Sequence, residues 1–471
     1  MTDLATDKAR SGPAPDIRPT GILAEMASGA CRFTEADRHQ AVRALIDTVA
    51  CMIAARESDP AIVATEAVRR WGAGRAITAR GDVLAAPWAA FVNGTTAHAQ
   101  DYDDVLEPAS AHVSAVLVPA LMALSAELPV SGTQLLDAYL AGFEVMARLG
   151  EAFGLIHYSR GWHTTLTLGA PAAAAATARL AGLDTVGTAT AISQSMSMSG
   201  GSKLHMGKIA KPVQAGLAAK AGLLATSLAE AGTTTNEEVF AGAWGAIEMM
   251  AGPDAPGFIG DLGDPAHPTA MSEYGVWLKA YPSCASTHRI VDGALALVRE
   301  HGFRAADVAR VDLTLPLTAS QNLMFDIPTT PGEARFSAHY CVAHALMEGH
   351  LGPAAFDPER LSRPDLKELM ARISRQVTPT QRVAGADLSD LSARVQIELV
   401  DGSTHRACVE VPYGHPGKPL SDDDLDAKFL ACAEAGRLGT GRARRLLQSI
   451  RDIRAHGDLS TFDWFGSGGK S

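Results

Sequence analysis

Carboxylate, imidazole and ammonium side chains gather at five short segments of an otherwise apolar sequence. The segments are 93–104 with His112 beyond it, 161–165, 203–208 with Lys211, 279–284 with 287–289, and 335–337. Imidazole and ammonium groups can remove a proton beside a carboxylate and hold the negative charge that develops there. A lysine or cysteine with a lowered pKa can take either role. These residue types therefore suit proton transfer beside a carboxylate.

Motifs that identify several other enzyme classes do not occur. The sequence contains no G-x-G-x-x-G after a strand, no G-x-x-x-x-G-K-[ST] loop, no H-E-x-x-H and no G-x-S-x-G elbow. A dinucleotide- or nucleotide-dependent enzyme and a serine hydrolase are thus disfavoured. His339, Cys341 and His344 are close in sequence, but their spacing does not place all three on one helix face. We predict ordinary packing there and no metal site.

The bulk composition indicates a folded chain and argues against a nucleic-acid partner. Of 471 residues, 47 % are hydrophobic and 20 % are charged, which permits a large core. The formal net charge is −11, whereas a nucleic-acid-binding protein should carry a basic surface. The six cysteines include no C-x-x-C pair, which fits a reduced cytoplasm. We find neither a signal peptide nor an apolar run of about 18 residues, so we predict a cytoplasmic protein without a membrane span.

Helical patterns dominate the first 270 residues. Thr34 is a suitable N-cap in front of apolar residues at helical spacing, and a second helix is predicted from Thr133. The stretches 170–180 and 215–231 are rich in alanine, whose small side chain favours helix and lets helices approach closely. These patterns predict a compact helical bundle.

The pattern changes near Lys279. Residues 308–315 and 393–400 alternate apolar and polar side chains, and a turn at Asp401-Gly402 followed by 405–411 predicts a β-hairpin. A helix is predicted over 337–347. Strands and a helix together indicate a smaller α+β unit.

We therefore predict a mainly α protein with a large helical domain and a smaller α+β lid. Ser421, followed by three aspartates, marks the start of a further helix beyond the lid. The predicted divisions are a disordered tail (1–20), the helical domain (21–270), the lid (271–405), a helical return to the first domain (406–460) and a loose tail (461–471).

At the five segments the sequence resembles the MmgE/PrpD family, which includes 2-methylcitrate dehydratase, cis-aconitate decarboxylase and iminodisuccinate epimerase. The matching stretches are NGTTAHAQDYDD, GWHTTLTLGAPAAAAA, KPVQAGLAAKAGLLA, KAYPSCASTH, ARFSAHYCVAHALMEG and GHPGKPLSDDDLDAKF. They follow one another in order over about residues 25–450. The resemblance implies a helical domain and a lid with the site in the cleft between them. It also implies a homodimer that acts on a small polycarboxylate without a cofactor.

The resemblance also assigns site residues by position. They are Asp101, His112, His163, Lys211 and Lys279. We expect His112 or His163 to be the acid or base and the two lysines to bind carboxylates, while Asp101 orients a histidine or the substrate. Further candidate substrate-binding residues in the same segments are Thr164, Lys208 and His288.

Structural roles compete with these assignments. Asp103 and Asp104 fit a carboxylate cluster at a helix start as well as they fit catalysis, and we favour a core role for His98. Lys208 also fits a solvated face, whereas Lys211 precedes an alanine-rich helix whose N-terminus favours anions. Five other histidines are interpreted as surface or loop residues, namely His157, His267, His301, His350 and His456.

Cys284 bears on which of the candidate reactions is expected. Animal cis-aconitate decarboxylases have a histidine at this position, and a thiol cannot replace an imidazole as a cationic donor. A thiol near lysines can still act as an acid or base, and a small buried residue is the equal structural alternative. We therefore rank a 2-methylcitrate-dehydratase-like hydro-lyase first, an iminodisuccinate-type epimerase or racemase second, and a cis-aconitate-type decarboxylase third.

Two hypotheses come from other classes. The D-x-D-D motif at 101–104 is similar to the protonating motif of class II terpene cyclases. Aromatic residues make up only 6 % of the chain, too few for the aromatic pocket that such carbocations need. A non-catalytic helical scaffold is the other hypothesis, but it would not need lysine, histidine and aspartate at five separate places.

Overall fold

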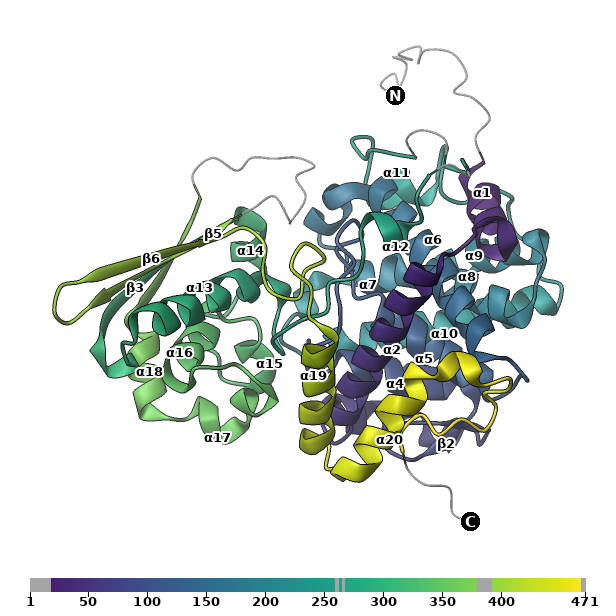
Figure 1. The fold of residues 1–471 in the computed structure, drawn as a ribbon. Helices are drawn as coiled ribbons and strands as arrows, with labels where there is room; N and C mark the ends of the chain where they lie inside the picture. The colour runs from purple at the N-terminus through teal and green to yellow at the C-terminus, as the bar shows by residue number, and fades with distance from the viewer. Residues whose placement is uncertain (1–17, 259–261, 265–266, 379–391, 467–471) are drawn as a thin grey trace, which may run out of the picture.

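The computed structural model describes residues 18–258, 262–264, 267–378 and 392–466. They form a helical domain and a smaller α+β domain that lie side by side (Figure 1). Each domain has its own hydrophobic core. The helical core takes in buried residues up to Leu278 and again from Leu420. The second core runs from Cys284 to Leu399, and Tyr158 and Met206 of the helical domain insert into it. The predicted fold class is confirmed.

Twelve helices of the described residues build the first part of the helical domain. They are α1 (Pro19–Glu25), α2 (Glu35–Ala55), α3 (Asp59–Val68), α4 (Ala86–His98), α5 (Ser114–Ser125), α6 (Gly132–Ser159), α7 (Thr164–Thr167), α8 (Gly169–Ala181), α9 (Thr185–Met196), α10 (Ala210–Glu230), α11 (Ala246–Met250) and α12 (Ala270–Glu273). A short hairpin of β1 (Ala76–Ile77) and β2 (Val83–Leu84) lies between α3 and α4. The predicted N-cap Thr34 forms a capping box with Asp37 at the start of α2.

Small residues set the spacing between α4 and α10, the two helices that lead into the candidate site. A Cβ on Gly94 of α4 would lie 2.9 Å from the Cα of Gly216 on α10. A Cβ on Gly216 would lie 2.2 Å from the carbonyl oxygen of Phe91 and 2.4 Å from Oγ1 of Thr95. The two backbones can approach this closely only because both positions are glycine. This contact places the start of α10, with Lys211, beside the segment that follows α4.

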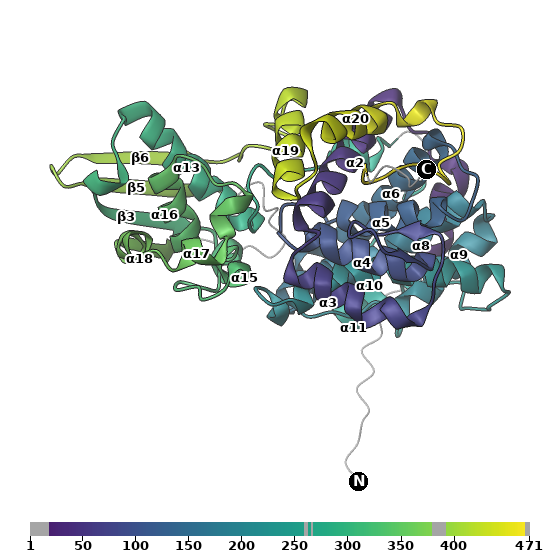
Figure 2. The ribbon, with the colours of Figure 1, turned by 90° about the horizontal axis from the view of Figure 1, so that it is seen from below.

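The α+β domain contains a four-stranded sheet covered by helices on one face (Figures 1 and 2). Its helices are α13 (Ala285–His301), α14 (Leu317–Asn322), α15 (Pro331–Ala334), α16 (Ala338–Glu348), α17 (Pro358–Leu361) and α18 (Pro364–Met370). Its strands are β3 (Val308–Leu315), β4 (Ile373–Val377), β5 (Ala393–Leu399) and β6 (Thr404–Val409), in the spatial order β4-β3-β5-β6.

The strand pairing follows from the alternation seen in the sequence. Strands β3 and β4 pair in parallel, whereas β3 with β5 and β5 with β6 pair antiparallel. Residues of β5 alternate between buried and less buried, so one face of the sheet packs on the helices. The predicted strands at 308–315 and 393–400, the hairpin that follows and the helix over 337–347 are confirmed.

The chain then returns to the helical domain, where α19 (Asp422–Ala435) and α20 (Thr440–Arg451) lie against α2 (Figure 2). Ser421 caps α19 as predicted. The predicted boundary at 405 is wrong, because it cuts through β6, which pairs with β5 along its length. The lid therefore extends to the end of β6.

Both predicted tails are too long, and one histidine was misplaced. Residues 1–17 and 467–471 lie outside the described residues, but helix α1 begins at Pro19, which is buried. Trp464 and Phe465 are buried in the helical core. His157, expected at the surface, is fully buried between Phe153 and Trp162, and burial lowers its pKa to about 4.

No helix among the described residues is both long and apolar enough to cross a membrane.

We expect Gly216→Ala to reduce the free energy of unfolding by about 1–3 kcal/mol or more, because the added methyl group overlaps the backbone of α4. Denaturant unfolding monitored by circular dichroism measures this loss. Gly200→Ala is the matched control, since a Cβ there meets no atom within 4 Å. Equal stability of the two variants would contradict the role assigned to the α4–α10 contact.

Candidate active site

A cavity lies between the two domains, and both contribute to its wall. From the helical domain the lining residues are Asp101, Val105, Ser110, His112, Tyr158, His163, Met206 and Lys211. From the lid they are Cys284, Ala285, Ser286, Asn322 and Phe336. All five segments singled out in the sequence thus supply residues that line this cavity.

Asp101 is the centre of a buried charge cluster. Its Oδ2 lies 2.9 Å from Nζ of Lys211, and its Oδ1 lies 2.5 Å from Nζ of Lys279. The Lys279 ammonium also donates to the Asp101 carbonyl oxygen at 2.8 Å. Asp101 has a positive φ of 53°, which is uncommon outside glycine. The backbone turn directs both its carboxylate and its carbonyl at lysines.

The cluster keeps Asp101 and Lys279 charged. Burial alone would raise the pKa of the Asp101 carboxyl, but the ammonium groups of Lys211 and Lys279 hold it well below its usual value. Burial would likewise lower the pKa of Lys279, but the carboxylates of Asp101 and Asp103 raise it. Two ammonium groups contact the single Asp101 carboxylate, so the Lys211–Asp101–Lys279 group has an excess of positive charge.

His112 is held as a neutral imidazole with a defined tautomer. Its Nδ1 lies 2.8 Å from the carbonyl oxygen of Asp104, which only accepts, so Nδ1 carries the proton. Its Nε2 therefore has the lone pair, and this atom lies 3.8 Å from Oδ1 of Asp101. Burial and then the charge of Lys279 lower the pKa of His112 well below the usual histidine value. The ring is thus a candidate base.

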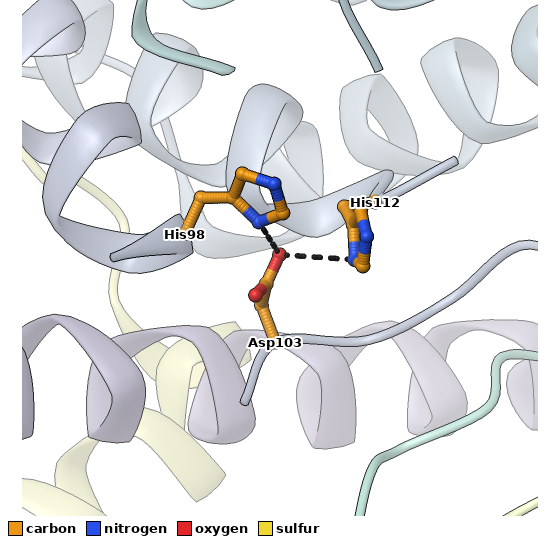
Figure 3. Close-up of side chains that lie close together, drawn as sticks. All are labelled: His98, Asp103 and His112. Carbon is orange, nitrogen blue, oxygen red and sulfur yellow. Dashed lines mark hydrogen bonds and ion pairs between the residues drawn. The ribbon is translucent and has the colours of Figure 1, made fainter. Parts of the chain in front are cut away.

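Asp103 lies between two histidines (Figure 3). Its Oδ2 is 2.8 Å from Nδ1 of His98 and 3.4 Å from Nδ1 of His112. Burial would raise the pKa of Asp103, but the two imidazoles lower it. A carboxylate in this place stabilises an imidazolium that forms when His112 takes up a proton at Nε2.

The same three side chains could in principle hold a cation. Their ligand atoms lie within 4.8 Å of one another. The short contact between His98 and Asp103 is already a hydrogen bond, and His112 Nδ1 is directed at the Asp104 carbonyl. We therefore assign this group to the orientation of His112. His98 is buried against Asp103, in agreement with the core role favoured for it.

His163 is oriented by a second hydrogen-bond chain. The amide of Gln214 donates to the carbonyl of Ser202 at 3.1 Å, so its Oε1 is the atom that faces Nδ1 of His163 at 3.0 Å. His163 therefore also keeps its lone pair on Nε2. Burial and the charge of Lys211 lower its pKa well below the usual value. The cavity thus has two neutral histidines in its wall.

Asp104 has a structural role at the start of α5. Its carboxylate accepts from the backbone nitrogen of Ser114 at 3.1 Å and from the Ser114 hydroxyl. This is the helix-start function considered for it. Burial raises its pKa to about 7. Asp101 and Asp103 are ionised against lysines and histidines, and Asp104 is bonded to Ser114 outside the cavity wall, so the D-x-D-D motif presents no protonated acid to the cavity.

Cys284 lies at the N-terminus of α13 and lines the cavity. Its backbone nitrogen donates to the carbonyl of Arg335 at 3.0 Å. Burial, followed by the negative charge of Asp101, raises the pKa of its thiol, so the thiol is protonated at neutral pH. The N-termini of α13 and α10 both reach the cavity, at Cys284 and Lys211, and helix N-termini favour anions.

Four predicted substrate-binding residues lie outside the cavity wall. Lys279 is fully buried behind Asp101. Oγ1 of Thr164 donates to the carbonyl of Ser110 at 2.6 Å and so supports a lining residue. Lys208 is largely exposed and forms an ion pair with Glu333 of the lid at 2.7 Å. His288 is buried against aromatic rings, and burial lowers its pKa to about 3.

Sequence reasoning missed a polar contact across the cavity. The hydroxyl of Tyr158 on α6 donates to Oδ1 of Asn322 on α14 at 2.9 Å, and Asn322 donates to Oγ of Ser286 at 3.3 Å. This bridge joins the two domains beside the cavity. Neither Tyr158 nor Asn322 belongs to an ionisable cluster, so residue type and spacing gave no signal for them. Phe336 lies in a segment that was noted, and its ring centroid is 5.2 Å from Nζ of Lys211.

A second cavity of about 460 Å³ lies elsewhere in the helical domain. Its ionisable wall includes Arg148 together with Glu144, Glu151 and Glu273, which pair with that arginine. Arg32 and Asp264 also line this cavity, so its carboxylates still outnumber its arginines. This cavity is therefore less suited to a polyanion than the interdomain cavity.

The fold and the interdomain cavity define a two-domain protein with a site for a small anion, and two family models match the chain, one on each side of the passage into the lid. The MmgE/PrpD N-terminal domain matches residues 23–259, and the MmgE/PrpD C-terminal domain matches residues 281–454. The chain belongs to the MmgE/PrpD family. The resemblance drawn from the five segments is confirmed.

Several relatives are cis-aconitate decarboxylases. The mouse (Mus musculus) protein is 31 % identical over 367 residues, covering 74 % of this chain and 71 % of the relative. The human (Homo sapiens) protein is 29 % identical, covering 79 % of this chain and 78 % of the relative. A protein of Aspergillus terreus is 28 % identical, covering 88 % of this chain and 89 % of the relative.

We expect Asp101→Asn to reduce the free energy of unfolding by about 3–5 kcal/mol, because it leaves two buried ammonium groups without a counter-charge. Chemical denaturation of the purified protein measures this. Asp312→Asn removes a carboxylate from a surface pair with Arg310 and should cost only about 0–1 kcal/mol. If both variants lost the same stability, Asp101 would not be the centre of the cluster.

Proposed function

We propose that this protein is a lyase for a small tricarboxylate, and that it releases CO2 from cis-aconitate or a close analogue without a cofactor. The observation that carries this proposal is the convergence of Lys211 and two helix N-termini on a cavity that also contains two neutral histidines and a protonated thiol. The relatives named cis-aconitate decarboxylase support the choice of substrate and reaction.

The binding part of the proposal follows from charge. A tricarboxylate entering the cavity meets the excess positive charge of the Lys211–Asp101–Lys279 group. Lys211 is the lysine of this group that lines the cavity and can contact a carboxylate directly. The N-terminus of α13, which reaches the cavity at Cys284, offers a second anion contact. The substrate would thereby be held between the helical domain and the lid.

Loss of CO2 places two demands on the site. The electron pair left on carbon must be delocalised onto a conjugated carboxylate, whose extra charge a fixed ammonium stabilises. One proton must then be delivered to carbon, so that one proton is taken up for each CO2 released. Lys211 meets the first demand. The Cys284 thiol, protonated because burial raises its pKa, meets the second. A neutral donor is sufficient here, which removes the objection raised by the missing histidine.

Dehydration of a citrate-like acid is the second candidate. It needs a base to remove a proton beside a carboxylate and an acid to protonate the leaving hydroxyl. The lowered pKa of His112 and of His163 favours the base role, and this is the observation that supports a hydro-lyase. The same lowered pKa makes neither histidine a source of the second proton at neutral pH. Epimerisation, which needs groups on both faces of one carbon, is ranked third.

The direct test is incubation of the purified protein with a panel of tricarboxylates and dicarboxylates in deuterated water, followed by NMR. The panel contains cis-aconitate, citrate, 2-methylcitrate and a chiral dicarboxylate. We expect cis-aconitate to lose CO2 and the product to carry one deuterium at carbon. Water loss from citrate or 2-methylcitrate would instead show a hydro-lyase. Exchange without net conversion would show an epimerase.

Two variants connect this result to the site. Cys284→Ala should lower the decarboxylation rate constant by about 100-fold or more if the thiol supplies the proton. Cys408→Ala is the matched control, because Cys408 is an exposed thiol on β6. Turnover of no member of the panel would overturn the proposed function, and full activity of Cys284→Ala would overturn the role of the thiol.

A cytoplasmic location and a homodimeric state stay predictions from the sequence.

A further inference from the structure

Three consecutive backbone carbonyls at the site are each held by a buried cationic side chain. Nε of Arg335 donates to the carbonyl of Gln100 at 2.9 Å. Nζ of Lys279 donates to that of Asp101 at 2.8 Å, and Nζ of Lys428 donates to that of Tyr102 at 2.8 Å. The donors come from the lid, from the segment before α13 and from the returning helix α19. We call these three donors the carbonyl clamp.

Lys428 has further partners besides the carbonyl of Tyr102. Its Nζ also donates to the carbonyl of Lys279 at 2.9 Å and lies 2.6 Å from Oδ1 of Asp47 on α2. Two of its N–H groups thus bond to backbone carbonyls, while Asp47 balances its charge as an ion-pair partner outside hydrogen-bond geometry. One buried group thus fixes the backbone on both sides of the Asp101–Lys279 ion pair.

The two backbone segments also pair with each other. The backbone groups of Val105 and Trp277 exchange hydrogen bonds at 2.9 and 3.0 Å. Lys428 bonds to Tyr102 and Lys279 farther along the same two segments. A shift of either segment would therefore separate Lys279 from Asp101, and the left-handed conformation of Asp101 would lose the contacts that hold it.

We propose that Lys428, through the carbonyl clamp, is a positioning residue that sets the orientation of Asp101 and Lys279 for catalysis. Lys428 does not line the cavity, so it acts on the substrate only through these two residues. This inference rests on the proposed function for its kinetic consequence. Its structural consequence is independent of any substrate.

The test variant is Asp47→Asn with Lys428→Met. The double substitution removes the ammonium without leaving the buried Asp47 carboxylate unpaired. We expect kcat for the reaction identified with the wild-type protein to fall about 100-fold, because small displacements of catalytic groups have effects of this size. We expect KM to change less than about threefold, because no group that contacts the substrate is altered.

The matched control is Glu144→Gln with Arg148→Met. It removes another buried ion pair of the helical domain, with a distance of 2.8 Å between Nε and Oε1, at a place outside the interdomain cavity. It should lower stability while leaving kcat within about twofold of the wild-type value. A loss of kcat as large as that of the Lys428 variant would mean that any lost ion pair impairs catalysis, and would overturn the positioning role.

Crystal structures of the wild-type and Asp47→Asn/Lys428→Met proteins supply a readout that needs no activity. We expect the variant to lose the Lys279–Asp101 contact or the positive φ of Asp101. If the wild type turned over no carboxylate, the proposed function would fail while this structural test still decided the role of Lys428. An unchanged Asp101 and Lys279 in the variant would overturn the inference.

Discussion

The buried Asp101 carboxylate with its two lysine partners is the interaction on which the site depends. A charge in a protein interior is tolerated only when it is paired and hydrogen-bonded. Here the two lysine partners come from different parts of the chain. Lys211 is carried by α10, which the glycine contact with α4 holds in place, and Lys279 lies where the chain passes into the lid. The ion pairs can form only when both parts have folded around the Asp101 segment.

The protonation states of the surrounding groups depend on this cluster. Its positive charge, added to burial, lowers the pKa of His112 and of His163, so both rings are neutral bases at neutral pH. Asp103 and Gln214 fix the ring orientations, while burial and the Asp101 charge keep the Cys284 thiol protonated. A cation, two bases and a weak acid thus share one cavity, and burial together with neighbouring charges sets the protonation states of the bases and the acid.

Residues close together in the sequence were sufficient to predict helix starts and the family. Features that depend on packing between distant parts of the chain could not be predicted. Thr34 and Ser421 are helix caps that a few neighbouring residues determine, and the segment motifs were sufficient to identify the family. Tyr158 and Asn322 meet only when the domains are assembled, so no spacing along the chain indicated them. Lys428 follows four aspartates and has the pattern of a solvated helix, and only the packing of α19 on α2 buries it.

The central claim is that the interdomain cavity binds a polycarboxylate against Lys211 and the start of α13. A crystal structure with propane-1,2,3-tricarboxylate, a saturated analogue that has no double bond to react, tests this claim most directly. The account predicts one carboxylate in contact with Nζ of Lys211, another at the backbone nitrogens of Ala285 and Ser286, and the carbon chain beside His112 and His163. Binding of the analogue in the cavity beside Arg148, with the interdomain cavity left empty at saturating concentration, would contradict it.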